Sequence, residues 1–164
     1  MWKKINSQSK ELYLNCIKKK ITITTAESCT GGMISSAIVH INGSSNIFKS
    51  SVVVYSNEMK SRMLNISDDL IIANGAVSEK VAINMAKNVL KLIKSDLSIA
   101  VTGIAGPTGG TIDKPIGLVW IAIGLKSNIF TKKFQFDGNR LEVRKKTTYE
   151  ALKLANKVIK ETKF

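Results

Sequence analysis

Apolar and polar positions follow two periods along the chain, and each period predicts one kind of element. Short stretches rich in β-branched residues, either alternating or apolar throughout, predict strands. The predicted strands cover residues 21–25, 48–55, 97–102, 116–125 and 129–136. Stretches with apolar residues three and four positions apart predict amphipathic helices. The predicted helices cover residues 7–18, 31–41, 57–64, 78–94 and 139–160.

Serine residues mark the start of two predicted helices. Ser7 is expected to cap the first helix, in which Leu14 is one of the apolar positions. Ser78 is expected to open the long helix that follows it, with Met85 and Leu92 on its apolar face. Residues 67–76 show no clear period and are expected to be irregular.

The order of the predicted elements indicates the fold class. Strands and helices alternate at first, and two adjacent strands and a helix follow. The stretch 97–102 is apolar almost throughout, which is typical of a strand with both faces buried. We therefore predict an α/β fold, a three-layer α/β/α sandwich with a mixed, mostly parallel sheet, in which residues 1–164 form one domain.

The charge balance is strongly basic and changes which partners are expected. The chain has 25 lysine and arginine residues against 12 aspartate and glutamate residues, a formal net charge of +13. A basic surface attracts nucleic acid and anionic metabolites alike. The basic residues are spread along the chain, with tight groups only at 18–20 and 144–146 and no interleaved aromatic residues. This distribution favours a small anionic metabolite over nucleic acid.

The sequence has no feature of a membrane, disulfide-rich or metal-binding protein. No apolar run reaches the roughly 18 residues of a membrane span, and the first residues lack the apolar core of a signal peptide. We expect a cytoplasmic protein with no membrane partner. Cys16 and Cys29 form no Cys-x-x-Cys pair, and His40 is the single histidine. Neither a disulfide framework, nor a metal site, nor a cofactor is therefore expected.

Two glycine-rich segments, residues 25–32 and 103–110, directly follow or overlap the ends of predicted strands. In an open α/β sheet, ligands gather at the carboxyl ends of the strands, so both segments are expected to line one cleft. Neither segment fits the P-loop or the Gly-x-Gly-x-x-Gly fingerprint. Glycines let a ligand approach the backbone closely. An ordinary long loop between a strand and a helix is the alternative for the second segment.

Ser28 lies on the turn between a predicted strand and a predicted helix, where a hydroxyl can attack an amide or ester. His40 lies at the far end of that helix, more than about 12 Å away at about 1.5 Å per residue, so a Ser-His-Asp triad is not expected. The candidate base is Lys60, with a pKa lowered by burial, and Tyr55 can donate a proton. A solvated lysine and a packed tyrosine are the alternatives. Cys29 competes as the nucleophile, because a thiol at a helix amino terminus has a lowered pKa, unless it is a small buried cysteine.

Arg140 and Arg144 stand one helical turn apart at the start of the last predicted helix. Two guanidinium groups on one helix face suit a phosphate or a carboxylate group. Two surface arginines with no ligand are the alternative interpretation of this spacing.

Five sequence blocks resemble a known family. They are Thr25-Ala26-Glu27-Ser28-Cys29-Thr30-Gly31-Gly32, Tyr55-Ser56-Asn57-Glu58-x-Lys60, Gly75-Ala76-Val77-Ser78, Thr102-Gly103-Ile104-Ala105-Gly106-Pro107-x-Gly109-Gly110 and Lys114-Pro115-x-Gly117-x-Val119-Trp120. In their order and spacing the chain resembles the CinA carboxy-terminal domain family, from about residue 12 to the last helix. The resemblance implies the same three-layer fold and self-association into a homo-oligomer, a dimer or larger.

The resemblance also implies an activity. Active members of the family are nicotinamide-nucleotide amidohydrolases (PncC), which convert nicotinamide mononucleotide to nicotinate mononucleotide and ammonia. Ser28 would be the nucleophile, Lys60 its base and Tyr55 an assisting group, in an acyl-enzyme mechanism that requires no metal. The N–H groups around Thr30 and Gly31 are expected to form the oxyanion hole. The rival interpretation is a non-catalytic nucleotide-binding or interaction module associated with competence or DNA damage.

The resemblance further implies which residues bind the nucleotide substrate. They are Glu27, Cys29, Thr30, Gly31, Gly32, Asn57, Thr102, Gly103, Ala105, Gly106, Gly109, Gly110 and Arg140. Two positions depart from the family's pattern. Ser51 replaces a glycine, and Asn139 stands where an aspartate is usual before Arg140. The second departure is expected to weaken the orientation of Arg140.

Overall fold

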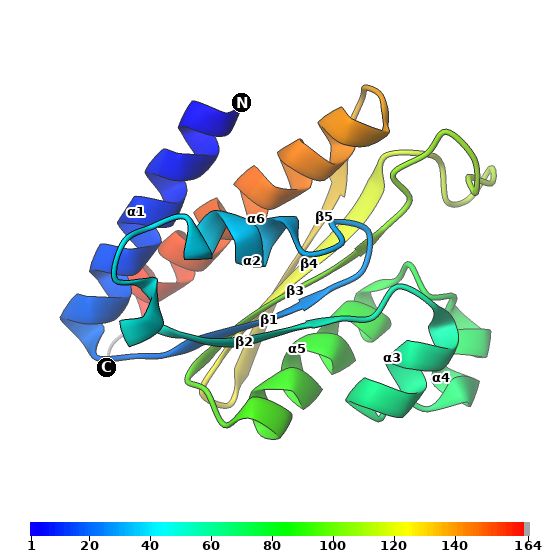
Figure 1. Ribbon diagram of the computed structural model, residues 1–164. Helices are drawn as coiled ribbons and strands as arrows, with labels where there is room; N and C mark the ends of the chain where they lie inside the picture. Colours follow the sequence, from blue (N-terminus) through cyan, green and yellow to red (C-terminus); the bar gives the residue numbers. More distant parts are fainter. Residues whose placement is uncertain (163–164) are drawn as a thin grey trace.

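Five strands form one mixed sheet in the order β2-β1-β3-β4-β5 in the computed structural model, which describes residues 1–162 (Figure 1). The strands are β1 (Ile23–Glu27), β2 (Phe48–Val53), β3 (Leu97–Gly103), β4 (Leu118–Leu125) and β5 (Asn128–Gln135). Strand β1 pairs in parallel with both β2 and β3, whereas β4 pairs antiparallel with both β3 and β5. The mixed sheet predicted from the sequence is confirmed.

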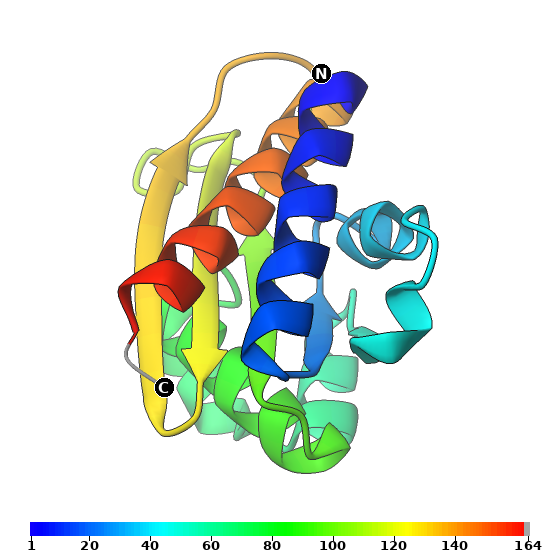
Figure 2. The same ribbon diagram turned by 90° about the vertical axis from the view of Figure 1, so that its left-hand side faces the viewer.

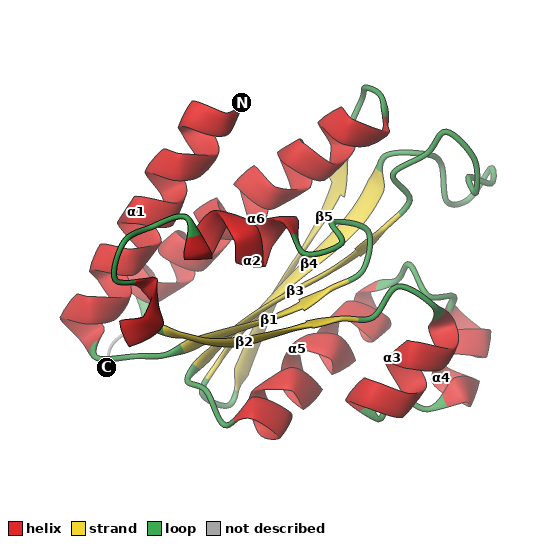
Figure 3. Cartoon of the chain, viewed as in Figure 1, coloured by secondary structure: helices red, strands yellow, loops and turns green. Residues whose placement is uncertain are grey.

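Helices cover both faces of the sheet (Figures 1 and 3). They are α1 (Trp2–Lys19), α2 (Met33–Val39), α3 (Asn57–Leu64), α4 (Asp68–Asn74), α5 (Glu79–Ile93) and α6 (Arg140–Glu161), with a short 3₁₀ turn at Ser44–Asn46. Helices α1, α2 and α6 lie on one face, with α1 and α6 side by side in Figure 2, and α3, α4 and α5 lie on the other. The three-layer α/β/α fold is confirmed. Within residues 1–162, no helix combines the length and apolarity that a membrane crossing needs.

The two faces of the sheet bury side chains of different size. Large residues such as Ile99 and Ile121 point toward α1, α2 and α6. On the other face, Ala26, Ala100 and Ala122 are paired across β1, β3 and β4 and form a row of small side chains. Successive residues of a strand point to opposite faces, so burial of both faces explains why β3 and β4 are mostly apolar. The alanine row forms part of the core against which α5 packs.

Helix α1 begins earlier than the sequence predicts. It starts at Trp2 with no side-chain cap, so the predicted cap at Ser7 is wrong. Its buried face includes Ile5 and Leu12, seven positions apart, whereas Leu14 is 55 % exposed. The first turns of α1 contain lysines and no capping side chain, so the sequence shows no clear helix start there. Ile5 is nevertheless fully buried, which shows that the helix already packs against the core at this position.

Residues 67–76 contain helix α4, so the expectation of an irregular segment is wrong. Ser67 is its N-cap and accepts a hydrogen bond from the N–H of Leu70 at 3.1 Å. Asp68 and Asp69 lie in the first turn, where their charge is favourable. Only Ile71 of this helix is buried. The apolar period is therefore nearly absent, and capping is the signal that identifies the helix.

Helix α5 starts as predicted. The Ser78 hydroxyl accepts a hydrogen bond from the N–H of Val81 at 3.3 Å, and Met85 lies fully buried on the same face. Leu92, expected on that face, is 54 % exposed. Helix α5 follows Ala76 and Val77, and Ala76 is hydrogen-bonded to Thr102 at the carboxyl end of β3.

Candidate active site

The carboxyl ends of three parallel strands meet at one edge of the sheet, because β1 lies between β2 and β3. The N–H of Ser28, the first residue after β1, donates to the carbonyl of Val101 on β3 at 3.1 Å. A cleft of about 240 Å³ opens there, near the lower end of the range of small-molecule sites. It is lined by Ser28, Cys29, Tyr55, Asn57, Lys60, Ala76, Val77, Thr102, Gly103, Ile104, Ala105, Gly106, Thr108, Gly109 and Arg140.

Most of the residues proposed from the sequence therefore come together, but some do not. The cleft lining excludes Glu27, Thr30, Gly31, Gly32 and Gly110. It also includes four residues that were not among the predicted substrate-binding residues. These are Ala76, Val77, Ile104 and Thr108.

The segment before α5 is the main addition to the predicted site. The Thr102 hydroxyl donates to the carbonyl of Ala76 at 2.8 Å, which links this segment to the end of β3. Ala76 and Val77 belong to a block that resembles the family pattern, and this block was the available signal. The position of this block in the sequence does not indicate that it lies on the same cleft as Ser28.

Two consecutive glycines shape the turn after Ser28. Gly31 and Gly32 have φ angles of +58° and +89°, the left-handed region that other residues adopt only with strain. The N–H of Gly31 donates to the Ser28 carbonyl at 3.1 Å and closes the turn. Ser28 is 7 % exposed at the wall of the cleft. The predicted strand-to-helix turn is confirmed, and its nucleophile candidate reaches the cleft.

The start of α2 is occupied by a carboxylate from the same chain. Glu27 is fully buried and accepts hydrogen bonds from the N–H groups of Gly32 and Ile34, each at 3.0 Å, and of Ser35 at 2.7 Å. It also accepts from the Thr30 hydroxyl at 2.7 Å. A carboxylate is favourable at a helix amino terminus, and this one uses the N–H groups that a ligand would need. Glu27 therefore organises the turn.

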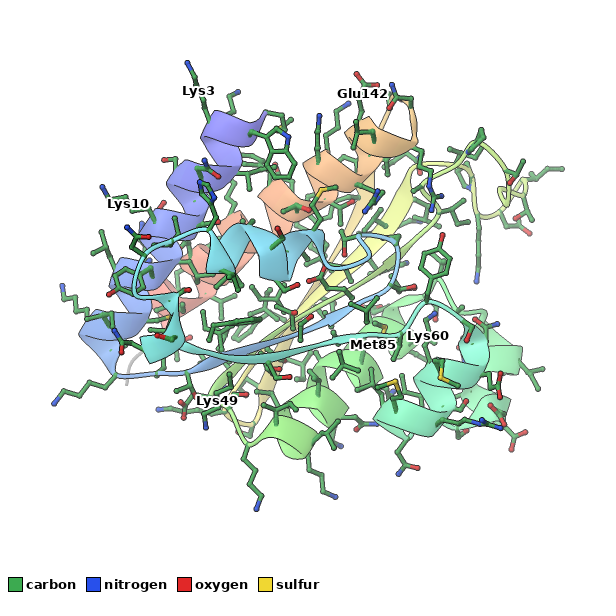
Figure 4. The ribbon with its side chains drawn as sticks, in the orientation of Figure 1. Lys3, Lys10, Lys49, Lys60, Met85 and Glu142 are labelled. Atoms are coloured by element: carbon green, nitrogen blue, oxygen red, sulfur yellow. The ribbon has the colours of Figure 1, made fainter. Side chains whose placement is uncertain are left out.

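Lys60 is a buried cation at the other side of the cleft, beside the carboxyl end of the sheet (Figure 4). It lies in the first turns of α3, a helix capped by the Ser56 hydroxyl, and it is only 1 % exposed. Its Nζ donates to the Tyr55 carbonyl at 3.2 Å. No carboxylate within residues 1–162 forms a salt bridge with it. Burial lowers the pKa of Lys60, which favours the neutral amine that a base requires.

Cys29 does not have the properties of a thiol nucleophile. The side chain is buried, and burial raises the pKa of Cys29 to about 12 although the charges of Lys60 and Arg144 act in the opposite direction. The expectation that the helix amino terminus lowers this pKa is wrong, because burial of the thiol outweighs any such effect and the negative charge of Glu27 raises the pKa of Cys29 further. The alternative of a small buried cysteine is correct.

The two arginines at the start of α6 do not form one anion fork. Arg140 donates to the Gly106 carbonyl at 2.9 Å and to the Tyr55 hydroxyl oxygen at 2.6 Å. Arg144 donates to the Thr30 carbonyl from Nη2 at 2.7 Å and from Nε at 3.3 Å. Arg140 thus connects α6 to the loop that contains Gly106, and Arg144 connects it to the turn after Ser28. Of the two, Arg140 lines the cleft.

Comparison with known proteins identifies the family. The profile described as CinA C-terminal domain matches residues 5–159, almost the whole chain. The chain belongs to the CinA C-terminal domain family. The family resemblance seen in the sequence is confirmed.

Relatives and solved structures support the same assignment. The chain is 49 % identical over 138 residues to a CinA-like protein of Endomicrobium trichonymphae and 39 % identical over 150 residues to one of Kosmotoga olearia. These matches cover 84 % and 91 % of this chain but 32 % and 36 % of the relatives, so the chain spans about a third of the length of the curated relatives it matches.

Crystal structures of similar proteins have the same fold along nearly their whole length. A competence/damage inducible protein from Agrobacterium tumefaciens is 33 % identical with a TM-score of 0.93, and the match covers 96 % of each chain. A competence damage-inducible protein A from Klebsiella pneumoniae is 30 % identical with a TM-score of 0.94, covering 97 % of this chain and 99 % of that one.

Asn139, the position where this CinA C-terminal domain departs from the family's usual aspartate, still caps α6. Its side-chain oxygen accepts from the N–H of Glu142 at 3.0 Å, and the Glu142 carboxylate accepts from the N–H of Asn139 at 2.8 Å. Glu142 lies at the first turn of α6 in Figure 4. This reciprocal capping box fixes the start of the helix, at which Arg140 is the first residue.

The second glycine-rich segment of the CinA C-terminal domain connects β3 to its antiparallel neighbour β4, so it is not the strand-to-helix loop considered from the sequence. A Cβ atom added at Gly106 or Gly110 would lie 2.7 or 2.9 Å from atoms of Ile116. These glycines allow the loop to fold against its own returning strand. The space beside these two glycines is filled by Ile116, and Gly106 also lines the cleft.

His40 lies outside the cleft, as its distance along α2 predicts. It is exposed, and it borders surface hollows near the start of α1. Across residues 1–162 there is no cluster of three or more histidine, cysteine, aspartate or glutamate side chains able to bind a metal ion.

Proposed function

We propose that the chain is an amidohydrolase that deamidates nicotinamide mononucleotide to nicotinate mononucleotide and ammonia, a reaction of pyridine-nucleotide salvage. The observation that supports this proposal best is the cleft shared by Ser28 and Lys60. A buried lysine without a carboxylate partner is costly to a fold, and such groups gather where a neutral amine is useful. The net charge of +13 favours an anionic substrate.

The reaction divides into two halves at Ser28. Its Oγ attacks the carboxamide carbon while the neutral Lys60 amine takes the hydroxyl proton, and a tetrahedral oxyanion forms. The C–N bond then breaks, the proton passes from Lys60 to the departing nitrogen, and ammonia leaves. Water attacks the resulting ester with Lys60 again accepting a proton. Cleavage of the ester returns that proton to Ser28 and releases the acid, so one water is consumed for each ammonia formed.

Tyr55 and Arg140 assist at the mouth of the cleft. Arg140 donates to the Tyr55 oxygen at 2.6 Å, so the phenol proton is available for a substrate oxygen or nitrogen. The position of Arg140 on the cleft lining supports a role in attracting the phosphate of the substrate.

Ammonia release from nicotinamide mononucleotide tests the proposal. The intact protein should release it, and Ser28→Ala should abolish release while the circular dichroism spectrum is retained. Ser36→Ala is the matched control, because Ser36 is an exposed serine of α2 outside the cleft. No release by the intact protein between pH 6 and pH 10 would contradict the proposal and favour the non-catalytic nucleotide-binding interpretation.

A further inference from the structure

The turn after Ser28 has few N–H groups left for an oxyanion. The N–H of Ser28 donates to Val101, and that of Gly31 donates to the Ser28 carbonyl. The groups at the start of α2 donate to the Glu27 carboxylate. In this turn, only the N–H groups of Cys29 and Thr30 donate to no oxygen atom of residues 1–162, and the N–H of Cys29 lies beside its own sulfur atom.

The direction of the Cys29 N–H follows from the peptide bond before it. A trans peptide places its C=O and N–H on opposite sides. The Ser28 carbonyl faces into the turn, where it accepts from the N–H of Gly31, so the Cys29 N–H points out of the turn. Cys29 lines the cleft next to the nucleophile. A donor adjacent to the nucleophile is well placed for the charge that develops on the attacked carbonyl oxygen.

Arg144 fixes the next peptide unit of the same turn. Its guanidinium donates two N–H groups to the Thr30 carbonyl, across 114 positions of sequence. That carbonyl and the N–H of Gly31 belong to one peptide unit, so Arg144 also fixes the bond from Gly31 to Ser28. A chain of hydrogen bonds thus runs from a cation through two peptide units to the Cys29 N–H, and each bond polarises the next.

We propose that the N–H of Cys29 donates to the oxyanion and that Arg144 is the positioning residue that orients and polarises it. This inference rests on the proposed amidase function, and it replaces the expected donor Gly31. Arg144 acts on the transition state through the turn, without touching the substrate. Its loss should therefore lower kcat by about tenfold to a hundredfold and leave KM nearly unchanged, less than the loss of a direct oxyanion donor, which costs about 100- to 1,000-fold.

The test compares Arg144→Met, Arg144→Lys and the control Lys145→Met, whose lysine lies over the ring of Trp2 away from the cleft. Two probes are used on each purified protein. Ammonia release from nicotinamide mononucleotide gives kcat and KM, and p-nitrophenyl acetate gives the rate at which Ser28 is acetylated, followed by nitrophenolate release and mass spectrometry. The ester forms the same kind of oxyanion but needs no nucleotide recognition.

The expected result is a reduced kcat and a reduced acetylation rate in Arg144→Met, partial recovery in Arg144→Lys, and wild-type values in Lys145→Met. A raised KM with unchanged kcat would overturn the inference, as would equal behaviour of Arg144→Met and Lys145→Met. If Arg144→Met does not fold, Arg144→Lys decides on the same criteria. Acetylation that slows in Arg144→Met, in a wild-type protein that does not deamidate the nucleotide, would support the inference and reject the proposed function.

Discussion

Glu27 and Lys60 are both buried at the carboxyl end of the sheet, but their surroundings differ sharply. Glu27 accepts hydrogen bonds from three N–H groups and from the hydroxyls of Thr25 and Thr30. Lys60 makes one hydrogen bond within the described chain, to the Tyr55 carbonyl. The first group is surrounded by partners, and the second has almost none.

This difference distinguishes a structural role from a candidate catalytic role. A buried charged group surrounded by donors repays its desolvation cost and stabilises the local backbone. A buried amine with one neutral acceptor does not, and it is pushed toward the uncharged form. The same degree of burial therefore makes Glu27 part of the scaffold and makes Lys60 a candidate base.

The strongest test of this contrast is Lys60→Met, which keeps the apolar stem and removes the amine. We expect kcat for nicotinamide mononucleotide to fall by about 1,000-fold, the scale of general-base catalysis. The urea midpoint at pH 7 should be unchanged or higher, because a poorly paired buried amine is removed. Lys87→Met, an exposed lysine of α5, is the control. A large loss of stability in Lys60→Met would make Lys60 a scaffold residue like Glu27.

The reciprocal test is Glu27→Gln, measured by urea unfolding. The amide nitrogen cannot accept from an N–H group, so donors at the start of α2 lose their partner. We expect the free energy of unfolding to fall by about 3 kcal/mol. Glu58→Gln is the control, since Glu58 forms an exposed pair with Arg62 at 2.9 Å and should change stability by less than about 0.5 kcal/mol. Equal stability of the two variants would contradict the scaffold role.

The pH dependence provides a third test, because the pKa of Lys60 is lowered from 10.5 by burial. The neutral amine is the active form, so kcat/KM should rise with pH and level off above this lowered pKa. Stability should also rise with pH between the lowered pKa and 10.5, since the unfolded chain binds the proton more tightly there. Lys60→Met should lose the stability change. A kcat/KM profile that rises only around pH 10.5 would show that the pKa of Lys60 is not lowered and would contradict its burial.

The smallest expected effect is that of a thiol reagent. A pKa of about 12 leaves Cys29 protonated at pH 8, so iodoacetamide should not reduce the proposed amidase activity. Activity after an hour of treatment, with mass spectrometry of the peptide that contains Cys29, measures this. Rapid inactivation with alkylation of Cys29 would reinstate the thiol as a nucleophile.

The sequence predicts the strands, most of the helices and the position of Ser28 and Lys60 on one cleft, because the signals lie in short stretches of the chain. Periods of two and of three to four residues mark elements that bury one face, and the ends of neighbouring strands share an edge. Helix α4 was missed because Ile71 is its single buried residue. Its signal lies in the serine cap and the two aspartates, which a search for apolar period overlooks.

The parts of the site that could not be predicted depend on contacts between distant residues. The link from Arg144 to Thr30 spans 114 positions, and a helical spacing of two arginines gives no sign that they separate onto different loops. Glu27 has the same difficulty at short range, because a strand residue that caps the following helix resembles a ligand-binding carboxylate in sequence. The direction of the side chain decides whether such a carboxylate caps a helix or binds a ligand. Sequence spacing alone does not show that direction.

The two arginines of α6 are synthesised after the other charged and nucleophilic residues of the candidate site. The ribosome makes Ser28, Tyr55 and Lys60 first, and 80 positions separate Lys60 from Arg140, about 4–16 s at typical elongation rates. Until α6 is made, the carbonyls of Thr30 and Gly106 lack their guanidinium donors. The nascent chain therefore carries the candidate nucleophile and the candidate base before the two arginines that link α6 to the neighbouring loops are made.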